Sequence, residues 1–400
     1  MLRILYITDS LMAGGIESQL VELVTRLDRA RFEPIVLSLY GPTARDLHFA
    51  PQLQAAHVPL VLPDLGWSAG DKARGMVAII RAARMFRPHL IQAEGYHANL
   101  LVRLAWPLLP RTSRLIGTVR GKNSPKQMRY ERLSWWMCRK IVTNAAHLKT
   151  DLHHRGHVPL DHILCVPNGI DTNLWRQPGD IGVRERIAPD ARFVLLSLTR
   201  ISFEKNVHWI AQALGLLKKA GRLPQDMKFI IAGPIQDIQA QRALDREIET
   251  HELANDVVQL PATRDPEAYY FACDTSVLFS PDEGLPNVAL ESLASGRPVV
   301  ISAAANTEGM ITDGKTGWIV PTGDVARLAE TLERVLALSH AELAGMRQAC
   351  LDRAAEYSVD ALVRRYTRLY ESWVTPSSAA RSLQAASVRE SPSRGVTRGS

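Results

Sequence analysis

Short aliphatic runs alternate with amphipathic stretches from the start of the chain to about residue 300. Parallel strands buried on both faces have this continuous apolar character, and the stretches between them form the covering helices. The alternation therefore predicts an α/β fold of doubly wound parallel sheets. In the first half, the expected strands lie near Leu2–Thr8, Pro34–Leu39, Val58–Leu62, His89–Ala93, Arg114–Val119, Lys140–Thr143 and Ile163–Val166.

A polar segment at 175–192, rich in Pro and Gly, interrupts this alternation, and 400 residues exceed what one core usually holds. We expect two Rossmann-like domains facing one another across a cleft: 1–174 and 193–356, joined by the linker 175–192. A helix at about 357–374 is expected to pack back onto the first domain, and the Ser-, Arg- and Gly-rich tail 375–400 to be disordered. The expected second-domain strands are Phe193–Leu198, Lys228–Ala232, Val257–Leu260, Thr275–Phe279 and Pro298–Ser302.

The cysteine pattern and the apolar segments predict a cytoplasmic location. The four cysteines lie far apart without zinc-binding spacing, as expected for reduced core residues. The first apolar run is cut short at Asp9, which fits a strand better than a signal peptide. The stretch Ala98–Pro110 contains Arg103 and falls short of the ~20 residues that span a bilayer, so no transmembrane segment is expected.

The turn after the first expected strand contains Gly14 and Gly15, directly before a helical run. In doubly wound sheets ligands bind beyond the carboxyl ends of the strands, and a helix start offers free N–H groups to an anion. The turn lacks the G-x-G-x-x-G pattern, and the next strand ends near Tyr40 instead of an acidic residue, so it is no dinucleotide fingerprint. A tight turn without a ligand is the alternative interpretation.

The corresponding turn of the second domain contains Arg200 and Lys205. An arginine fork and a lysine ammonium between a strand and a helix are suited to binding one diphosphate. Basic residues in loops are more often only solvated, so this signal is weak when taken alone.

The segment Ser280–Pro298 carries the strongest signal in the chain. Gly284 permits close backbone approach, Pro286 suits a first helical turn, and Gly296 suits a helix end. Glu283 then lies in the loop and Glu291 about one turn inside the helix. Carboxylates bind sugar and ribose hydroxyls, while loop amides near 284–285 bind a phosphate, so the segment predicts a nucleotide-sugar site.

The spacing of Glu283 and Glu291 resembles the Glu-x7-Glu motif of retaining glycosyltransferases with the GT-B fold, particularly glycosyltransferase family 4. The Arg200/Lys205 loop resembles that family's donor-diphosphate pair, and the segment 166–171 resembles the one that closes its first domain. The resemblance extends over residues 1–374 and implies a nucleotide-diphosphate sugar as donor. It implies that Glu283 contacts the transferred sugar and Glu291 the ribose. The implied donor-binding residues are Gly14, Gly15, Arg200, Lys205, Gly284, Leu285, Pro286, Asn287 and Glu291.

The acceptor side departs from the family pattern, in which histidines follow the fourth and fifth strands. Here His97, Arg120 and Lys122 occupy that region. The candidate catalytic residues are therefore Glu283, Arg200, Lys205 and His97. A lone histidine at a helix start, such as His97, is more often structural. Arg120 stands where a histidine is common, which leaves a catalytically inactive nucleotide-sugar-binding subunit as one alternative. A sugar-nucleotide epimerase is another, but no carboxylate and histidine set for elimination is evident.

No two aspartates are two positions apart, so the D-x-D type of metal site is absent from the sequence. We therefore expect neither a metal nor a cofactor. The negative charge of the leaving diphosphate is then stabilised by Arg200, Lys205 and helix dipoles.

Basic residues are concentrated between positions 101 and 160, a segment that contains twelve Lys or Arg but only two acidic residues, Glu131 and Asp151. A helix expected at Ser124–Arg139 combines such residues with Tyr130, Trp135 and Trp136. The pattern favours an anionic membrane surface as a partner, with peripheral binding at the inner face and a hydroxyl acceptor that is lipid-linked or part of the cell envelope. Packing of the tryptophans against the sheet is the alternative. Nucleic acid is not expected, because no aromatic binding module or zinc finger accompanies the charge.

Overall fold

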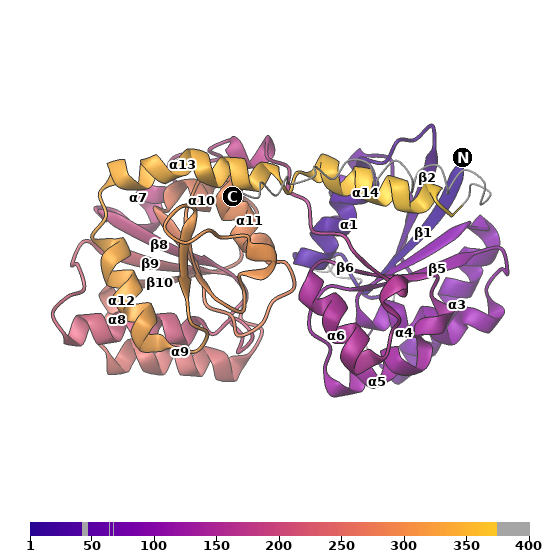
Figure 1. Ribbon diagram of the computed structural model, residues 1–400, viewed down its shortest axis with the longest axis horizontal. Coiled ribbons are helices and arrows are strands. Elements are labelled where there is room, and N and C mark those ends of the chain that lie inside the picture. The colour runs from indigo at the N-terminus through magenta and orange to yellow at the C-terminus, as the bar shows by residue number, and fades with distance from the viewer. Residues whose placement is uncertain (42–46, 64, 67, 374–400) are drawn as a thin grey trace, which may run out of the picture.

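The computed structural model describes residues 1–41, 47–63, 65, 66 and 68–373, so the tail expected at 375–400 lies outside the described residues. Two domains stand side by side, each a parallel sheet between layers of helices (Figure 1). This arrangement confirms the predicted fold class.

The first sheet has the strand order β3-β2-β1-β4-β5-β6-β7, and its strand pairs are parallel. All seven strands were expected from the apolar runs, and most differ from the expected ranges by one or two residues at an end. Their bounds are β1 Leu2–Thr8, β2 Phe32–Ser38, β3 Leu60–Val61, β4 Leu90–Glu94, β5 Arg114–Val119, β6 Lys140–Thr143 and β7 Ile163–Cys165. The order places the carboxyl ends of β1 and β4 side by side at the centre of the sheet.

Two apolar layers bury the faces of this sheet. One contains the inward side chains of the helices α3 to α6, and the other those of α1, α2 and the C-terminal helix α14. The helices are α1 Gly15–Thr25, α2 Ala50–Ala55, α3 Ala69–Phe86, α4 Tyr96–Ala105, α5 Pro125–Ser134, α6 Ala146–Gly156 and α14 Val359–Glu371.

The second sheet has the order β10-β9-β8-β11-β12-β13. Its strands are β8 Phe193–Leu198, β9 Met227–Ala232, β10 Val257–Leu260, β11 Thr275–Leu278, β12 Val299–Ser302 and β13 Gly317–Val320. The edge strand β13 was not expected, because its apolar run is only three residues long, Trp318–Val320, and lies in a segment rich in Gly and Thr. The covering helices are α8 Val207–Lys219, α9 Ile238–Thr250, α10 Pro266–Ala272, α11 Asn287–Ala294, α12 Val325–Leu336 and α13 His340–Ala355.

The chain crosses between the domains twice, and the crossings lie side by side. Ile170 N donates to Tyr357 O, and Val359 N donates to Ile170 O. After the second crossing α14 lies on the first domain (Figure 1), where Tyr366 and Tyr370 are fully buried. In the segment 175–192, the short helix α7 (Val183–Ile187) packs against α10 of the second domain.

Within the described residues, no helix is both long enough and apolar enough to cross a membrane. The four cysteines are free, and three of them are buried.

Candidate active site

Lys205 and Glu283 meet above the carboxyl edge of the second sheet. Lys205 precedes α8 and Glu283 follows β11, and the Lys205 Nζ forms an ion pair with Glu283 Oε1. Their side chains are only 15% and 12% exposed, so little solvent separates them. Since an ammonium group has three N–H donors, Lys205 retains donors for a further anion.

Arg200 follows β8 at the same edge, but its side chain is 43% exposed. It forms an ion pair with Glu204, which is itself largely exposed. Solvent-exposed ion pairs of this kind contribute little to stability, so the guanidinium is available to a ligand that enters the cleft.

The loop after β11 is held from both domains. Thr307 Oγ1 donates to Gly284 O at 2.6 Å from within the second domain. A Cβ on Gly284 would collide with the backbone carbonyl of Arg120 and would lie 2.8 Å from Asn144 Oδ1, both of which belong to the first domain. The glycine was expected to make room for a ligand, and here it makes room for the opposite domain.

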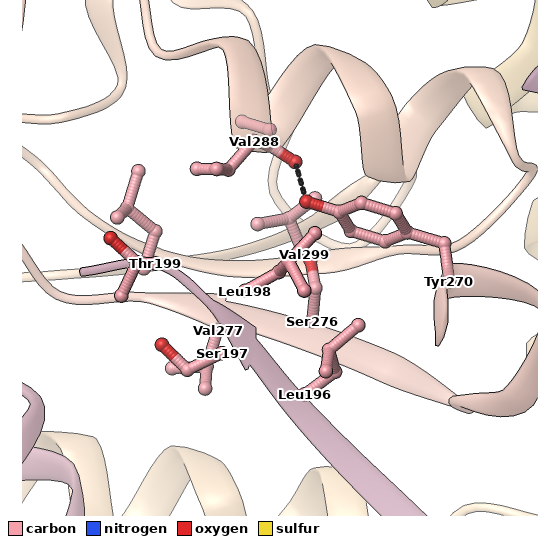
Figure 2. Close-up of a pocket in the computed structure, with 11 residues that line it drawn as sticks. Leu196, Ser197, Leu198, Thr199, Tyr270, Ser276, Val277, Val288 and Val299 are labelled. Atoms are coloured by element: carbon pink, nitrogen blue, oxygen red, sulfur yellow. Dashed lines mark hydrogen bonds between the residues drawn. The ribbon is translucent and has the colours of Figure 1, made fainter. Parts of the chain in front are cut away.

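Glu291 lies one turn inside α11 and accepts a hydrogen bond from the Tyr270 hydroxyl at 3.2 Å. The same hydroxyl bonds to the Val288 carbonyl (Figure 2), above a small pocket lined by β8, β11 and α11. Burial raises the pKa of Glu291 to about 7, and the nearby Glu267 adds to the rise. The carboxyl group is therefore poised between neutral and charged forms near neutral pH.

Gly14 and Gly15 lie at the start of α1, on the first-domain side of the cleft. Gly15 O accepts a hydrogen bond from Asn287 Nδ2 at 3.2 Å, so the two predicted donor loops touch one another. Glu17 folds back over Gly14, and burial raises its pKa to about 7. The carboxylates of Asp9 and Glu94 add to this rise, while Arg200 of the second domain opposes it.

His97 sits in the first turn of α4, with its Nδ1 3.5 Å from Asp9 Oδ2. Asp9 also accepts hydrogen bonds from the backbone N–H groups of His97 and Ala98, at 3.2 and 2.6 Å. Gly95 permits this arrangement, since its φ is +91° and a Cβ there would meet the Asp9 carboxylate at 2.7 Å. Asp9 thus fixes the histidine at the carboxyl ends of β1 and β4.

Arg120 is buried and does not face an open acceptor surface. Its Nε and Nη2 donate to Glu94 at 2.9 and 3.3 Å, its Nη1 to Asn168 at 3.2 Å, and its Nη2 also to the Tyr366 hydroxyl. Glu94 is fully buried, with further bonds from Gln92 and Thr118. A buried carboxylate needs such pairing, which explains why a guanidinium occupies this position.

Lys122 bridges the two domains through Asp282, with 3.1 Å between Nζ and Oδ2. Both residues line a cavity of about 320 Å³ beside α6. The remaining lining residues are His147, Leu148, Thr150, Asp151, His154 and Arg155. Asp282 directly precedes Glu283, so the cavity reaches the loop that bears Glu283.

The structure therefore brings together Lys205 and Glu283, Gly15 and Asn287, and Lys122 with the loop that bears Glu283. Leu285 and Pro286 complete that loop, with Pro286 as the N-cap of α11. Sequence analysis missed Asp9, Glu17, Glu94 and Asn168, which lie in the cleft or at its floor. Asp9, Glu94 and Asn168 are single polar residues at or shortly after a strand end, and Glu17 lies in the first turn of α1, so none belongs to a distinctive spacing. Asp9, Glu94 and Asn168 lie in segments to which the sequence drew attention, but no role was expected of them.

Comparison with known proteins places both halves of the chain in one group of enzymes. Residues 13–174 match the family model described as Glycosyltransferase Family 4, and residues 183–356 match the one described as Glycosyl transferases group 1. A D-inositol 3-phosphate glycosyltransferase from Thermobispora bispora is 24% identical over 387 residues, 90% of either chain. A putative colanic acid biosynthesis glycosyltransferase, WcaL from Salmonella typhimurium, is 25% identical over 46% of either chain. Among solved structures, HepE from Anabaena in complex with UDP-glucose has a TM-score of 0.80 at 20% identity, covering 93% of this chain and all of that one.

Proposed function

This chain belongs to glycosyltransferase family 4, and we propose that it moves a sugar from a nucleotide-diphosphate donor to a hydroxyl acceptor with retention of anomeric configuration. The observation that carries the proposal is the Lys205–Glu283 ion pair beside Arg200, opposite the start of α1. A cation for the diphosphate and a carboxylate for the sugar stand next to each other there.

The donor is proposed to lie across the cleft with its diphosphate between Lys205, Arg200 and the N-termini of α1 and α11. These groups stabilise the negative charge that develops as the bond between the anomeric carbon and the diphosphate breaks. Glu283 binds the sugar and Glu291 the ribose. Support for a uridine nucleotide comes from HepE, whose structure was solved with UDP-glucose.

The acceptor hydroxyl is proposed to attack from the face that the diphosphate leaves. A new bond forms between the acceptor oxygen and the anomeric carbon, and the hydroxyl proton passes to the departing diphosphate. His97, oriented by Asp9, is proposed to bind the acceptor. No metal takes part in this scheme.

We propose a cell-envelope polysaccharide or glycolipid as the product. Similarity to a colanic acid glycosyltransferase and to a capsular polysaccharide glycosyltransferase supports this class of product. The acceptor is then large, and the open cavity beside α6 offers room for a part of it next to the attacked hydroxyl.

A surface of the first domain suits binding to anionic lipid at the inner face of the membrane. Arg103 and Glu131 form a buried ion pair that joins α4 to α5. Near this junction, Leu133 and Trp136 are 65% and 61% exposed. Five further side chains of α4, α5 and the segments that follow them are also exposed, and we propose that they form one lipid-facing patch with Leu133 and Trp136: Leu104, Leu108, Arg129, Arg132 and Arg139. Exposed apolar groups among cations are what a peripheral membrane site requires.

Thermal unfolding with UDP-, GDP- and ADP-sugars tests the donor assignment. A donor at one hundred times its dissociation constant stabilises the fold by ~2.7 kcal/mol. Product analysis by NMR then separates the possibilities: transfer or slow donor hydrolysis with retained configuration supports the proposal. An epimerised free nucleotide sugar, or binding without turnover on any acceptor, would support the epimerase or the inactive subunit instead.

A further inference from the structure

A chain of side-chain hydrogen bonds crosses the cleft through Asn168. Asn168 is 4% exposed and follows β7 at the end of the first domain. Its Nδ2 donates to Leu285 O at 2.9 Å and to Asn287 Oδ1 at 2.7 Å, both on the loop that bears Glu283. Asn287 Nδ2 in turn donates to Gly15 O and to Ser18 Oγ of α1, at 3.2 and 3.1 Å.

The direction of every bond in this chain is set from its two ends. At one end Arg120 can only donate, so Asn168 must present its Oδ1 to the guanidinium and its Nδ2 to the loop. At the other end Gly15 O can only accept, so Asn287 must present its Nδ2 to α1 and its Oδ1 to Asn168. Neither amide can turn over without placing two acceptors or two donors in contact.

This chain of hydrogen bonds through Asn168 and Asn287, called the relay below, starts from a part of the first domain that is itself held by hydrogen bonds. Arg120 is held by two bonds to the buried Glu94. Gly169, next to Asn168, is tied to Gln19 of α1 by a reciprocal pair of bonds at 2.7 and 2.8 Å. Asn168 is therefore a fixed point of the first domain, against which the loop 285–287 of the second domain is aligned.

We propose that Asn168 is a positioning residue for the transfer reaction: fixed by Arg120 and Glu94, it docks the loop that carries Glu283 onto the first domain. This inference rests on the proposed function for its kinetic consequence, although the docking itself does not depend on it. It also gives Arg120 a role in place of the expected histidine, since a neutral imidazole offers one N–H donor and cannot bond to Glu94 twice and to Asn168 as well.

Isosteric replacement by aspartate tests the direction of the relay. In Asn168→Asp one carboxylate oxygen still accepts from Arg120, so the first domain keeps its contact, while the other oxygen faces Leu285 O and Asn287 Oδ1. In Asn287→Asp an oxygen faces Gly15 O. The matched control is Asn173→Asp, which makes the same charge change at a nearby exposed side chain.

The measurements use the full chain. Small-angle scattering without ligand should give a larger radius of gyration for both variants than for Asn173→Asp, because the domains separate. With the nucleotide sugar found by the donor screen, kcat/KM should fall at least about tenfold, mainly through kcat, while the thermal midpoint of Asn168→Asp stays close to that of the control.

The outcomes separate the relay from the activity. If both variants match Asn173→Asp in kcat/KM, Asn168 is not a positioning residue. If the wild-type chain transfers no sugar, the proposed function fails, and scattering alone decides the relay: equal radii overturn it and larger radii support it. If Asn168→Asp fails to fold, the ligand-free radius of gyration of Asn287→Asp decides the relay alone, because Asn287 is itself an expected donor-binding residue: an equal radius overturns the proposal and a larger one supports it.

Discussion

Lys205 and Glu283 form an ion pair although 78 positions separate them along the chain. Each lies in the loop that follows a different strand, and these strands, β8 and β11, are neighbours at the middle of the second sheet. Their low exposure means that neither charge is freely hydrated. The pair therefore places a cation and a carboxylate at a fixed distance where a sugar diphosphate would need them.

Removing either donor-side cation is expected to slow turnover. Lys205→Ala and Arg200→Ala should each lower kcat a hundredfold or more, since one lost charge-assisted contact to the leaving diphosphate costs on the order of 3 kcal/mol at the barrier. Steady-state kinetics with Lys219→Ala as the control, an exposed lysine at the end of α8, measures the effect. Wild-type kinetics in either variant would remove that residue from the donor site.

The raised pKa of Glu291 predicts a pH-dependent stability. Its folded value of about 7 lies above the ordinary 4.5, so the fold binds the proton more tightly than the unfolded chain does. This contribution is fully present below pH 4.5 and is lost as the pH rises through 7. Glu291→Gln stays neutral and can still accept from Tyr270, so its stability relative to wild type should rise between pH 5 and pH 8, by on the order of 2–3 kcal/mol.

Chemical denaturation at several pH values measures this difference. The control is Glu185→Gln, an exposed carboxylate on α7. A gap between Glu291→Gln and wild type that is the same at pH 5 and pH 8 would mean that Glu291 titrates normally.

Gly284→Ala tests the close approach of the two domains. Its added methyl group would meet the Arg120 carbonyl and the Asn144 side chain, so either the loop shifts or the domains part. Overpacking of this kind typically costs about 1–3 kcal/mol. Gly345→Ala on α13, where no atom stands in the way of a methyl group, is the control and should be neutral or slightly stabilising. Equal thermal midpoints and equal activity in the two variants would contradict this packing.

Chelation tests the metal-free mechanism. No group of three or more His, Cys, Asp or Glu side chains that could hold a metal ion occurs in the part of the chain that the structure describes. With Arg200 and Lys205 meeting the diphosphate charge, transfer should continue in EDTA. Loss of activity on chelation and its return with magnesium or manganese would show that the mechanism needs a metal.

The sequence predicted the sheets well because buried parallel strands are continuous apolar runs, as in β1 and β8, whose ends match the expected ranges. It also predicted that Lys205 and Glu283 each lie in a turn between a strand and a helix, but it did not predict that the two strands are neighbours. It did not predict β13, because the apolar run of this edge strand is only three residues long, Trp318–Val320, and lies between segments rich in Gly and Thr.

The sequence patterns could not predict the contacts between the two domains. Gly284 is typical of a loop that approaches a ligand, and nothing in its spacing tells that Arg120 and Asn144 lie against it. The Asn168–Asn287 pair shows the same limit, since each residue alone resembles an ordinary polar residue in a loop or at a helix start. Such pairings depend on how two separately folded sheets dock, which no periodicity within one domain encodes.

The proposed lipid-facing patch around Leu133 and Trp136 predicts that the protein binds anionic lipid through these two side chains. Wild-type protein should sediment with anionic vesicles and weakly with neutral ones, and added salt should release it, because screening reduces the attraction of each basic residue. Trp136→Ser should reduce binding, since the indole is 61% exposed and is available to the interface. Ile238→Ser, at a similarly exposed apolar residue on α9 of the second domain, should bind as wild type does. Equal binding to neutral and anionic vesicles, or an equal loss in both variants, would favour an acceptor free in solution.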